Sequence, residues 1–487
     1  MKNINLILGI FVLSGLASCQ KFLDKAPISS YNVNSAYQSQ SDFQLAITGT
    51  YRNLGSISFN RTIFTESRTD NVKARQIGSE NQTFAILSTF TETPATSSII
   101  NLWSSYWAVI SQTNIIIERI NAASFDDENM RNAIKGEAYF LRGFAYFELA
   151  WMWGGMPLVD HQVTPAELAQ IKRSSQSETL EFAKGDFLKA IDLLPEAWPS
   201  KYLGRATKYA AEGYLARLYM FNGEFEKSIP ALTDIIQSNR YQMAALYPDI
   251  FSEANDNSKE HVFQVQFNAG AGALSFTLPQ YLIGPYVNQY FPNGSSPGIF
   301  ISDDLYDAFD NNDERRDFSL IRGMYSTSGI YNTTTIYNIK FAHGITPANI
   351  SSYGLNMPLL RYTDILLMYA ESLNEARSNA ATDIFDIVNT VRARAGLDPI
   401  NGSGLTKEEI RDIISSERRL EFNFEGIRWF DLIRTNKALS TMTAFLARTD
   451  EGSAQYKMNQ HQILFPIPQD EININPDPNY MWQNPGF

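Results

Sequence analysis

Apolar side chains recur at helical spacing through much of the chain, and this periodicity restricts the fold more than any other feature. Residues 100–120 and 131–153 carry long apolar stripes of this kind, which predict two long helices. Gly154-Gly155 and Pro157 follow the second stripe, and these residue types end helices because glycine caps them and proline cannot continue them. The sequence therefore predicts a mainly α fold.

Two further segments have the pattern of helix pairs. Residues 210–232 place small and apolar residues where a tetratricopeptide-type hairpin packs, with Gly223 at the turn. Residues 358–395 resemble a second hairpin, which Gly396 ends. Because no strict repeat of roughly 34 residues is visible, we expect scattered helix pairs within one domain rather than a regular solenoid.

Capping-box spacing marks two predicted helix starts. Ser41 with Gln44, and Thr406 with Glu409, have the spacing in which a hydroxyl and a side chain three residues later satisfy each other's backbone N–H groups. We therefore expect helices to begin near Ser41 and Thr406.

The helical signal fades between residues 241 and 355, where Gly, Ser, Asn and Thr are frequent. Short β-like runs appear at 261–267 and 333–341. A long loop-rich stretch inside a helical domain usually carries function. We predict one domain over residues 35–487, with a helical scaffold mainly at 35–240 and 356–440, an irregular ligand lobe at about 241–355, and a docked Pro-rich tail at 464–487.

Composition excludes several classes of protein. Lys and Arg number 40 against 52 Asp and Glu, giving a net charge of −12, so nucleic acid is an unsuitable partner. One cysteine forms no internal disulfide, and it cannot build a cysteine-based zinc site. Aromatic residues reach 13%, which is rich enough for a use beyond core filling.

The first nineteen residues have the pattern of a bacterial lipoprotein signal. Lys2 precedes a short apolar stretch that is too short to cross a bilayer, and Leu16-Ala17-Ser18-Cys19 looks like a lipobox. We predict a signal peptide at 1–18, lipidation of Cys19, and a polar tether at 19–34. The alternative is an ordinary secretory signal with a chance cysteine.

Few features of the sequence indicate catalysis. HExxH and GxxxxGK[ST] are both absent from the sequence. A pair of carboxylates, as used by glycosidases, remains an open enzymatic route because sequence cannot show their separation. Glu417, Glu421 and Glu425 lie among arginines and aromatic residues, so we interpret them as a buried structural ion-pair network. We predict no catalytic residue, no metal ligand and no cofactor.

Four separated stretches match one family pattern, in order along the chain. They are Cys19–Pro27, Leu141–Val159, Glu417–Arg434, and Phe465–Pro476 continued by Gln483–Phe487. Together they resemble the SusD/RagB family of outer-membrane lipoproteins of Bacteroidota. The resemblance implies tetratricopeptide-like helix pairs opposite an irregular ligand lobe. It also implies a non-enzymatic lid on a SusC-like TonB-dependent transporter, to which the protein delivers glycans or sometimes peptides.

Candidate ligand contacts follow from sugar chemistry. A sugar offers apolar C–H faces and a ring of hydroxyls, so its site needs an aromatic plate beside planar polar groups. One candidate group is the polar loop with Arg68, Asp70 and Asn71. The other is the set of tyrosines of the irregular lobe, for each of which packing is the alternative: Tyr281, Tyr286, Tyr290, Tyr325, Tyr331, Tyr337 and Tyr353.

The sequence thus predicts a lipid-anchored, cell-surface protein of the outer membrane that binds oligosaccharides or polysaccharides for a SusC-like transporter. A peptide-binding member of the same uptake system is one alternative. A glycoside hydrolase on a helical scaffold is another, and a helical-repeat scaffold for periplasmic proteins is a third.

Overall fold

The computed structural model describes residues 37–74, 82–270, 274–283, 299–325, 331–346, 348–349, 352–377, 381–448, 456–474 and 476–487. The signal peptide, Cys19 and the tether predicted for residues 1–34 lie outside the described residues.

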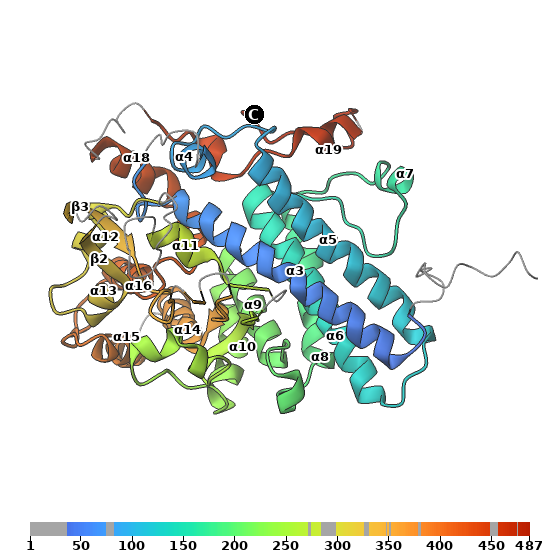
Figure 1. The fold of residues 1–487 in the computed structure, drawn as a ribbon, viewed down its shortest axis with the longest axis horizontal. Helices are drawn as coiled ribbons and strands as arrows, with labels where there is room; N and C mark the ends of the chain where they lie inside the picture. The colour runs from blue at the N-terminus through green and yellow to red at the C-terminus, as the bar shows by residue number, and fades with distance from the viewer. Residues whose placement is uncertain are drawn as a thin grey trace, which may run out of the picture.

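Long helices form the first half of the molecule, and Figure 1 shows them as a layered bundle. The described helices of this half are α3 (Gln40–Ser67), α4 (Gln82–Ser88), α5 (Ser97–Arg119), α6 (Glu128–Trp153), α7 (Pro165–Leu168), α8 (Gln176–Leu193), α9 (Lys208–Phe221) and α10 (Phe225–Gln237). Consecutive members pack on one another: α5 on α6, α6 on α8, α8 on α9, and α9 on α10. Gly223 has φ +72° at the α9–α10 turn, so the predicted hairpin turn is confirmed.

The irregular lobe lies at the opposite side of the molecule from α5 and α7 (Figure 1). Its elements are β1 (His261–Val265), α11 (Leu278–Ile283), α12 (Asp303–Ala308), α13 (Glu314–Ser319), β2 (Leu320–Tyr325), β3 (Tyr331–Asn338) and β4 (Met357–Arg361). The strands form two antiparallel pairs, β1 with β4 and β2 with β3. The predicted short β segments at 261–267 and 333–341 are therefore strands in their larger part.

Helices return after β4. They are α14 (Tyr362–Ala376), α15 (Ala381–Arg394), α16 (Lys407–Glu421), α17 (Arg428–Arg434), α18 (Ala438–Arg448) and α19 (Gln469–Ile474). Helix α14 packs against α10, α15 and α16, so it joins the two helical halves. The predicted mainly α fold, with helix pairs and few short strands, is confirmed.

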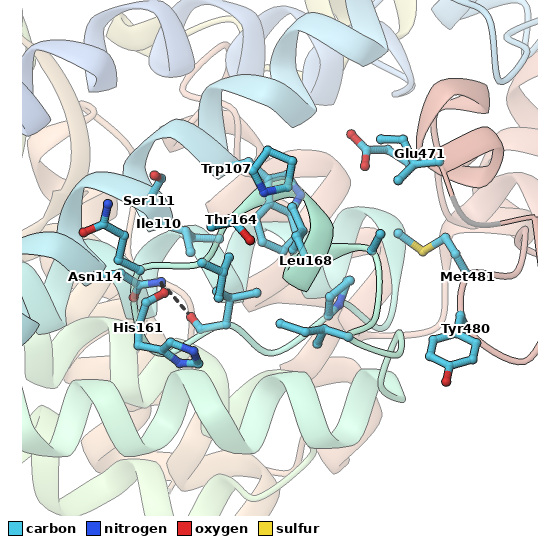
Figure 2. Close-up of a pocket in the computed structure, with 18 residues that line it drawn as sticks. Trp107, Ile110, Ser111, Asn114, His161, Thr164, Leu168, Glu471, Tyr480 and Met481 are labelled. Atoms are coloured by element: carbon cyan, nitrogen blue, oxygen red, sulfur yellow. Dashed lines mark hydrogen bonds between the residues drawn. The ribbon is translucent and has the colours of Figure 1, made fainter.

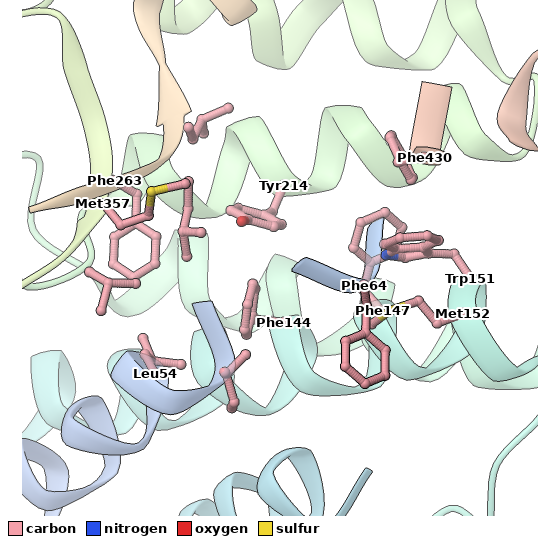
Figure 3. Close-up of a cluster of buried hydrophobic side chains, with 14 of the residues drawn as sticks. Leu54, Phe64, Phe144, Phe147, Trp151, Met152, Tyr214, Phe263, Met357 and Phe430 are labelled. Carbon is pink, nitrogen blue, oxygen red and sulfur yellow. The ribbon is translucent and has the colours of Figure 1, made fainter. Parts of the chain in front are cut away.

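Aromatic side chains from several of these elements pack against one another in the core (Figure 3). The ring of Phe140 on α6 meets Phe263 of β1 edge-on, with centroids 5.0 Å apart. Phe430 of α17 contacts both Phe147 and Trp151 of α6, at 5.8 and 5.4 Å. Such edge-on contacts add about 0.5–1.5 kcal/mol each beyond the burial of apolar area. The core therefore fixes the C-terminal helices and the lobe strand on the long helix α6.

The C-terminal tail is held by polar contacts to the same helix. The side-chain amide of Asn484 donates to the carbonyls of Trp153, at 2.9 Å, and Phe465, at 2.7 Å. The guanidinium of Arg173 donates to the carbonyls of Gly155 and Trp482. The bond to Trp153 occupies one of the carbonyls that the end of α6 leaves unpaired.

A central ion-pair network joins the lobe to the helices, and its members are Glu260, Asp313, Arg315, Lys340, Arg361, Arg394, Glu417, Glu421 and Glu425. Arg361, at the end of β4, lies 2.9 Å from Glu421 and 2.8 Å from Glu425. All of these side chains are at most 3% exposed. The interpretation of Glu417, Glu421 and Glu425 as structural is thus confirmed.

Two local predictions were wrong. Helix α3 is capped by Ser39, whose hydroxyl accepts from Asp42, rather than by Ser41, because the aspartate completes the capping box two residues earlier. Residues 358–361 belong to β4 rather than to the following helix, since they pair with β1. Within the Pro-rich tail, α19 forms a short helix between the prolines.

Replacing Glu421, which pairs with three arginines, tests how much the ion-pair network contributes to the free energy of unfolding. Burial alone would raise the pKa of Glu421, but Arg394, Arg361 and Arg315 outweigh it and hold this pKa well below its ordinary value of 4.5. Its stabilisation is present above the unfolded-state pKa and is lost as pH falls below it. We expect Glu421→Gln to lower the free energy of unfolding by roughly 3–5 kcal/mol at pH 7, measured by urea denaturation.

Glu181→Gln is the matched control, because that exposed carboxylate pairs only with Lys184 on the surface of α8. Its effect should lie between about 0 and 1 kcal/mol. The difference between Glu421→Gln and the parent should shrink as pH falls below 4.5. A pH-independent difference would contradict the assignment.

Candidate functional site

The predicted polar loop after α3 is buried. The Arg68 guanidinium lies 2.6 Å from Glu92 and donates to the carbonyl of Gln462. The Cζ atom of Arg68 also lies 4.5–5.1 Å from the centroids of three aromatic rings, those of Phe90, Trp429 and Phe465. Arg68 is fully buried, so its hydrogen-bonding groups face protein rather than solvent.

Asp70 and Asn71 lie beside it with internal partners of their own. The carboxylate of Asp70 accepts two hydrogen bonds from Arg428, at 2.9 and 2.8 Å, and lies 3.2 Å from Arg419. Asn71 donates to Glu66 and accepts from Arg419. Burial raises the pKa of Asp70, but the two guanidiniums outweigh it and hold the pKa below its ordinary value. As ligand contacts these residues stay a prediction, and their bonds favour a structural role.

Among the predicted tyrosines, Tyr281 has an exposed ring in a defined aromatic setting. It lies on α11, where Leu278 and Leu282, one turn apart, are buried and leave Tyr281 36% exposed on another face. Its ring centroid is 5.0 Å from that of Phe59 and 5.9 Å from that of Phe84. We call Phe59, Phe84 and Tyr281 the Tyr281 surface. It joins α3, α4 and α11.

Two aromatic members of this surface were missed by sequence reasoning. Phe59 lies inside α3 and Phe84 inside α4, so each resembled an ordinary packing residue. Phe59 is only half-buried, and this becomes meaningful once α11 brings a tyrosine against it. A local sequence window carries no signal for contacts between residues about two hundred positions apart.

The other predicted tyrosines are placed differently. Tyr325 and Tyr331 pair across the β2–β3 hairpin, and Tyr331 is 47% exposed. Helix α11 packs against β3, so this hairpin adjoins the helix that carries Tyr281. Tyr337 and Tyr353 are buried, and burial raises the pKa of Tyr353 above its ordinary value. The two remaining predicted residues, Tyr286 and Tyr290, lie outside the described residues.

A group of charged side chains lies at the β2 strand of this hairpin. Lys73, just after α3, is 2.7 Å from Asp303, and Arg322 of β2 lies 2.8 Å from the same carboxylate. All three side chains are partly exposed. They present hydrogen-bonding groups to solvent between the end of α3 and the hairpin.

A hollow of about 520 Å³ lies over Tyr353. The rings of Phe318 and His343 stack there with centroids 4.1 Å apart, and the His343 Nε2 atom contacts the Phe318 carbonyl at 2.8 Å. Glu253 is the one carboxylate in its lining.

Another hollow, of about 320 Å³, lies between α5, the segment around α7 and the C-terminal tail. Figure 2 shows Trp107 and Leu168 above it, with Glu471 and Met481 entering from the tail. Aliphatic side chains dominate its lining, and the Asn114 amide donates to the carbonyls of Val159 and His161. This lining suits apolar groups better than sugar hydroxyls.

The described ranges contain neither a metal-site cluster nor a membrane-spanning helix. Within them, no three His, Cys, Asp or Glu side chains lie together as a metal site would require. In the same part of the chain, no helix combines the length and apolar character needed to cross a bilayer.

Two family descriptions match this sequence. "Starch-binding associating with outer membrane" matches residues 21–220, and "SusD family" matches residues 322–487. A SusD-like protein from Formosa agariphila is 28% identical over 512 aligned positions that cover 98% of each chain. A SusD-like protein from Bacteroides ovatus is 23% identical, over 89% of this chain and 82% of its own.

Solved structures share the fold. A SusD superfamily protein from Bacteroides vulgatus has a TM-score of 0.78 at 21% identity, covering 93% of this chain and 100% of that one. Surface glycan-binding protein A from Bacteroides thetaiotaomicron, solved in complex with laminarihexaose, has a TM-score of 0.76 at 23% identity. That match covers 92% of this chain and 100% of the other.

A stability measurement separates the two roles open to Asp70. If the residue is structural, Asp70→Asn removes the charge that balances Arg428 and should lower the free energy of unfolding by about 3 kcal/mol in urea denaturation. Asp307→Asn is the control, since its carboxylate is 71% exposed and 3.5 Å from Arg322. A fully stable Asp70→Asn protein with impaired ligand binding would instead assign the residue to the ligand.

Proposed function

Because the chain belongs to the SusD/RagB-like family, we propose that it is a carbohydrate-binding lipoprotein of the outer membrane. It holds oligosaccharides at the Tyr281 surface and delivers them to a SusC-like TonB-dependent transporter. The starch-binding description matched by residues 21–220 and the laminarihexaose complex of a structural neighbour support carbohydrate as the ligand class.

The observation that carries this proposal is the exposed ring of Tyr281 on its aromatic support. A sugar ring stacks its C–H face on an aromatic plate and directs its hydroxyls to polar groups at the edge. Phe59 and Phe84 contact the Tyr281 ring, so it is held before ligand arrives and little side-chain entropy is lost on binding. The partly exposed Lys73, Asp303 and Arg322 offer hydrogen-bonding groups near the β2–β3 hairpin, whose strand β3 packs against α11.

Binding without cleavage fits the chemistry of the hollows. Glycosidic hydrolysis uses two carboxyl groups about 5–9 Å apart. The hollow over Tyr353 is lined by one carboxylate, Glu253, and that beside α7 by one, Glu471. The closely spaced carboxylates of Glu417, Glu421 and Glu425 instead pair with cations in the central ion-pair network.

Titration calorimetry of the purified protein with neutral oligosaccharides tests the ligand class and the surface. The panel contains laminarihexaose and gluco-, xylo- and manno-oligosaccharides of similar length. We expect at least one to bind, and we expect Tyr281→Ala to weaken it about tenfold, or about 1.4 kcal/mol. Tyr281→Phe should retain most of the affinity because the ring remains.

Tyr219→Ala is the matched control, a half-buried tyrosine on α9. Unchanged affinity in Tyr281→Ala would remove the surface from the proposal. Smaller sugars accumulating during incubation, detected by chromatography, would show an enzyme instead of a binding protein.

The lipid anchor has its own test. Attached acyl chains contribute about 0.8 kcal/mol for each buried CH₂, so their loss should release the protein from the membrane. We expect Cys19→Ala to move the protein from the membrane fraction to the soluble fraction while its circular dichroism spectrum stays unchanged. A Cys19→Ala protein that sediments with membranes would show that the lipobox interpretation is wrong.

A further inference from the structure

A pocket of about 410 Å³ lies at the end of the helical scaffold, away from the hollows described above. It is formed by the α8–α9 connection, by residues 239–241 after α10, and by the segment 257–264 that leads into β1. Its size is within the range of small-ligand sites. We call it the Lys259 pocket, and its lining includes Trp198, Arg205, Arg240, Tyr241, Lys259 and Glu196.

Positive charge gathers in this pocket although the chain carries a net charge of −12. Arg205, Arg240 and Lys259 line it together with the carboxylate of Glu196. Arg240 pairs with Glu196 at 2.6 Å, at the exposed rim. The Lys259 ammonium is exposed and has no carboxylate within 4 Å among the described residues. An anion entering the pocket therefore finds a cation that no protein group neutralises.

The histidine in the lining does not change this balance. His261 is buried at the start of β1, and burial, together with the nearby Arg361 charge, lowers its pKa to about 4. It is therefore neutral at pH 7. Arg205 pairs with the buried Glu137 at 3.2 Å and Arg240 pairs with Glu196, so the unbalanced positive charge of the pocket comes from Lys259.

Aromatic and polar groups accompany the cations. The half-buried Trp198 is fixed by its indole N–H, which donates to the Ala206 carbonyl at 2.7 Å. The hydroxyl of Tyr241 lies 3.2 Å from that of Thr207. The guanidinium of Arg205 lies 5.6 Å from the Trp198 ring centroid. An aromatic plate beside fixed polar groups is the arrangement that sugar rings need.

We propose that the Lys259 pocket is a second saccharide site, selective for oligosaccharides that carry carboxylate or sulfate groups. This inference rests on the proposed carbohydrate-binding function and adds a charge preference at a separate location. A uronate or sulfate group pairs with Lys259 and Arg240 while its sugar ring packs near Trp198 and Tyr241. The Tyr281 surface shares none of these residues, so the two sites can be removed independently.

Calorimetry with charge-matched ligands tests the pocket. The probes are an oligogalacturonide with its methyl ester, and a sulfated carrageenan oligosaccharide with its desulfated form. At least one charged probe should bind more tightly than its neutral partner, and more weakly at high salt because screening weakens exposed charge pairs. Lys259→Gln and Arg240→Gln should each weaken that binding about threefold, and the double variant about tenfold.

Lys227→Gln is the control, an exposed lysine near the other end of α10. Tyr281→Ala should leave the charged probe unaffected. Binding that is weakened in Lys259→Gln but unchanged in Lys227→Gln and Tyr281→Ala supports the inference. The inference is overturned if neither charged probe exceeds its neutral partner, or if Tyr281→Ala abolishes the binding.

The neutral panel keeps the two proposals apart. Neutral oligosaccharides that bind at Tyr281, with no preference for charged probes, would leave the proposed function standing and remove the second site. If neither neutral nor charged saccharides bind, the proposed function itself fails.

Discussion

Burial of charge at the centre of the molecule is the constraint on which the rest of the structure depends. Glu421 at the end of α16 meets Arg361 of β4, Arg394 of α15 and Arg315 of α13. Taking an ion out of water costs several kcal/mol, so each member is tolerated only while its partners are in place. The lobe segments and the helices must therefore assemble together.

Buried polar contacts also connect the segment after α16 to the helix that supports the Tyr281 surface. Beyond α16, the backbone N–H of Gly426 donates to Glu66, and Arg428 holds Asp70. Both acidic residues lie at or just after the end of α3, the helix that presents Phe59. Charge pairing in the interior thus fixes the helix on which the exposed aromatic ring of Tyr281 rests. A ring supported in this way can serve a ligand without rearranging.

Local sequence predicted the helices well and the contacts poorly, for a physical reason. Helix formation is governed by side chains three and four residues apart, which a short window contains, so α5, α6 and the α9–α10 hairpin followed from spacing and from Gly154 and Gly223. The burial of Glu421 among charges was also readable, from the aromatic residues around it. Its partners were not, because Arg315 and Arg361 come from elements more than fifty residues away.

The candidate site shows the same division. Tyr281 was predicted from composition, whereas Phe59 and Phe84 gained their meaning only from the fold. The loop with Arg68, Asp70 and Asn71 looked like a polar ligand site because charge in a loop usually faces water. Here each of its charges has an internal counter-charge, brought by α17 or by the residues around Glu92 and Arg419. By contrast, Lys259 has no such partner in the described structure, and an unneutralised cation beside a fixed aromatic ring points outward to a ligand. Pairing together with burial therefore marks the structural charges of this fold, whereas charges at the surface, such as Lys259 and Arg240, stay open to a ligand.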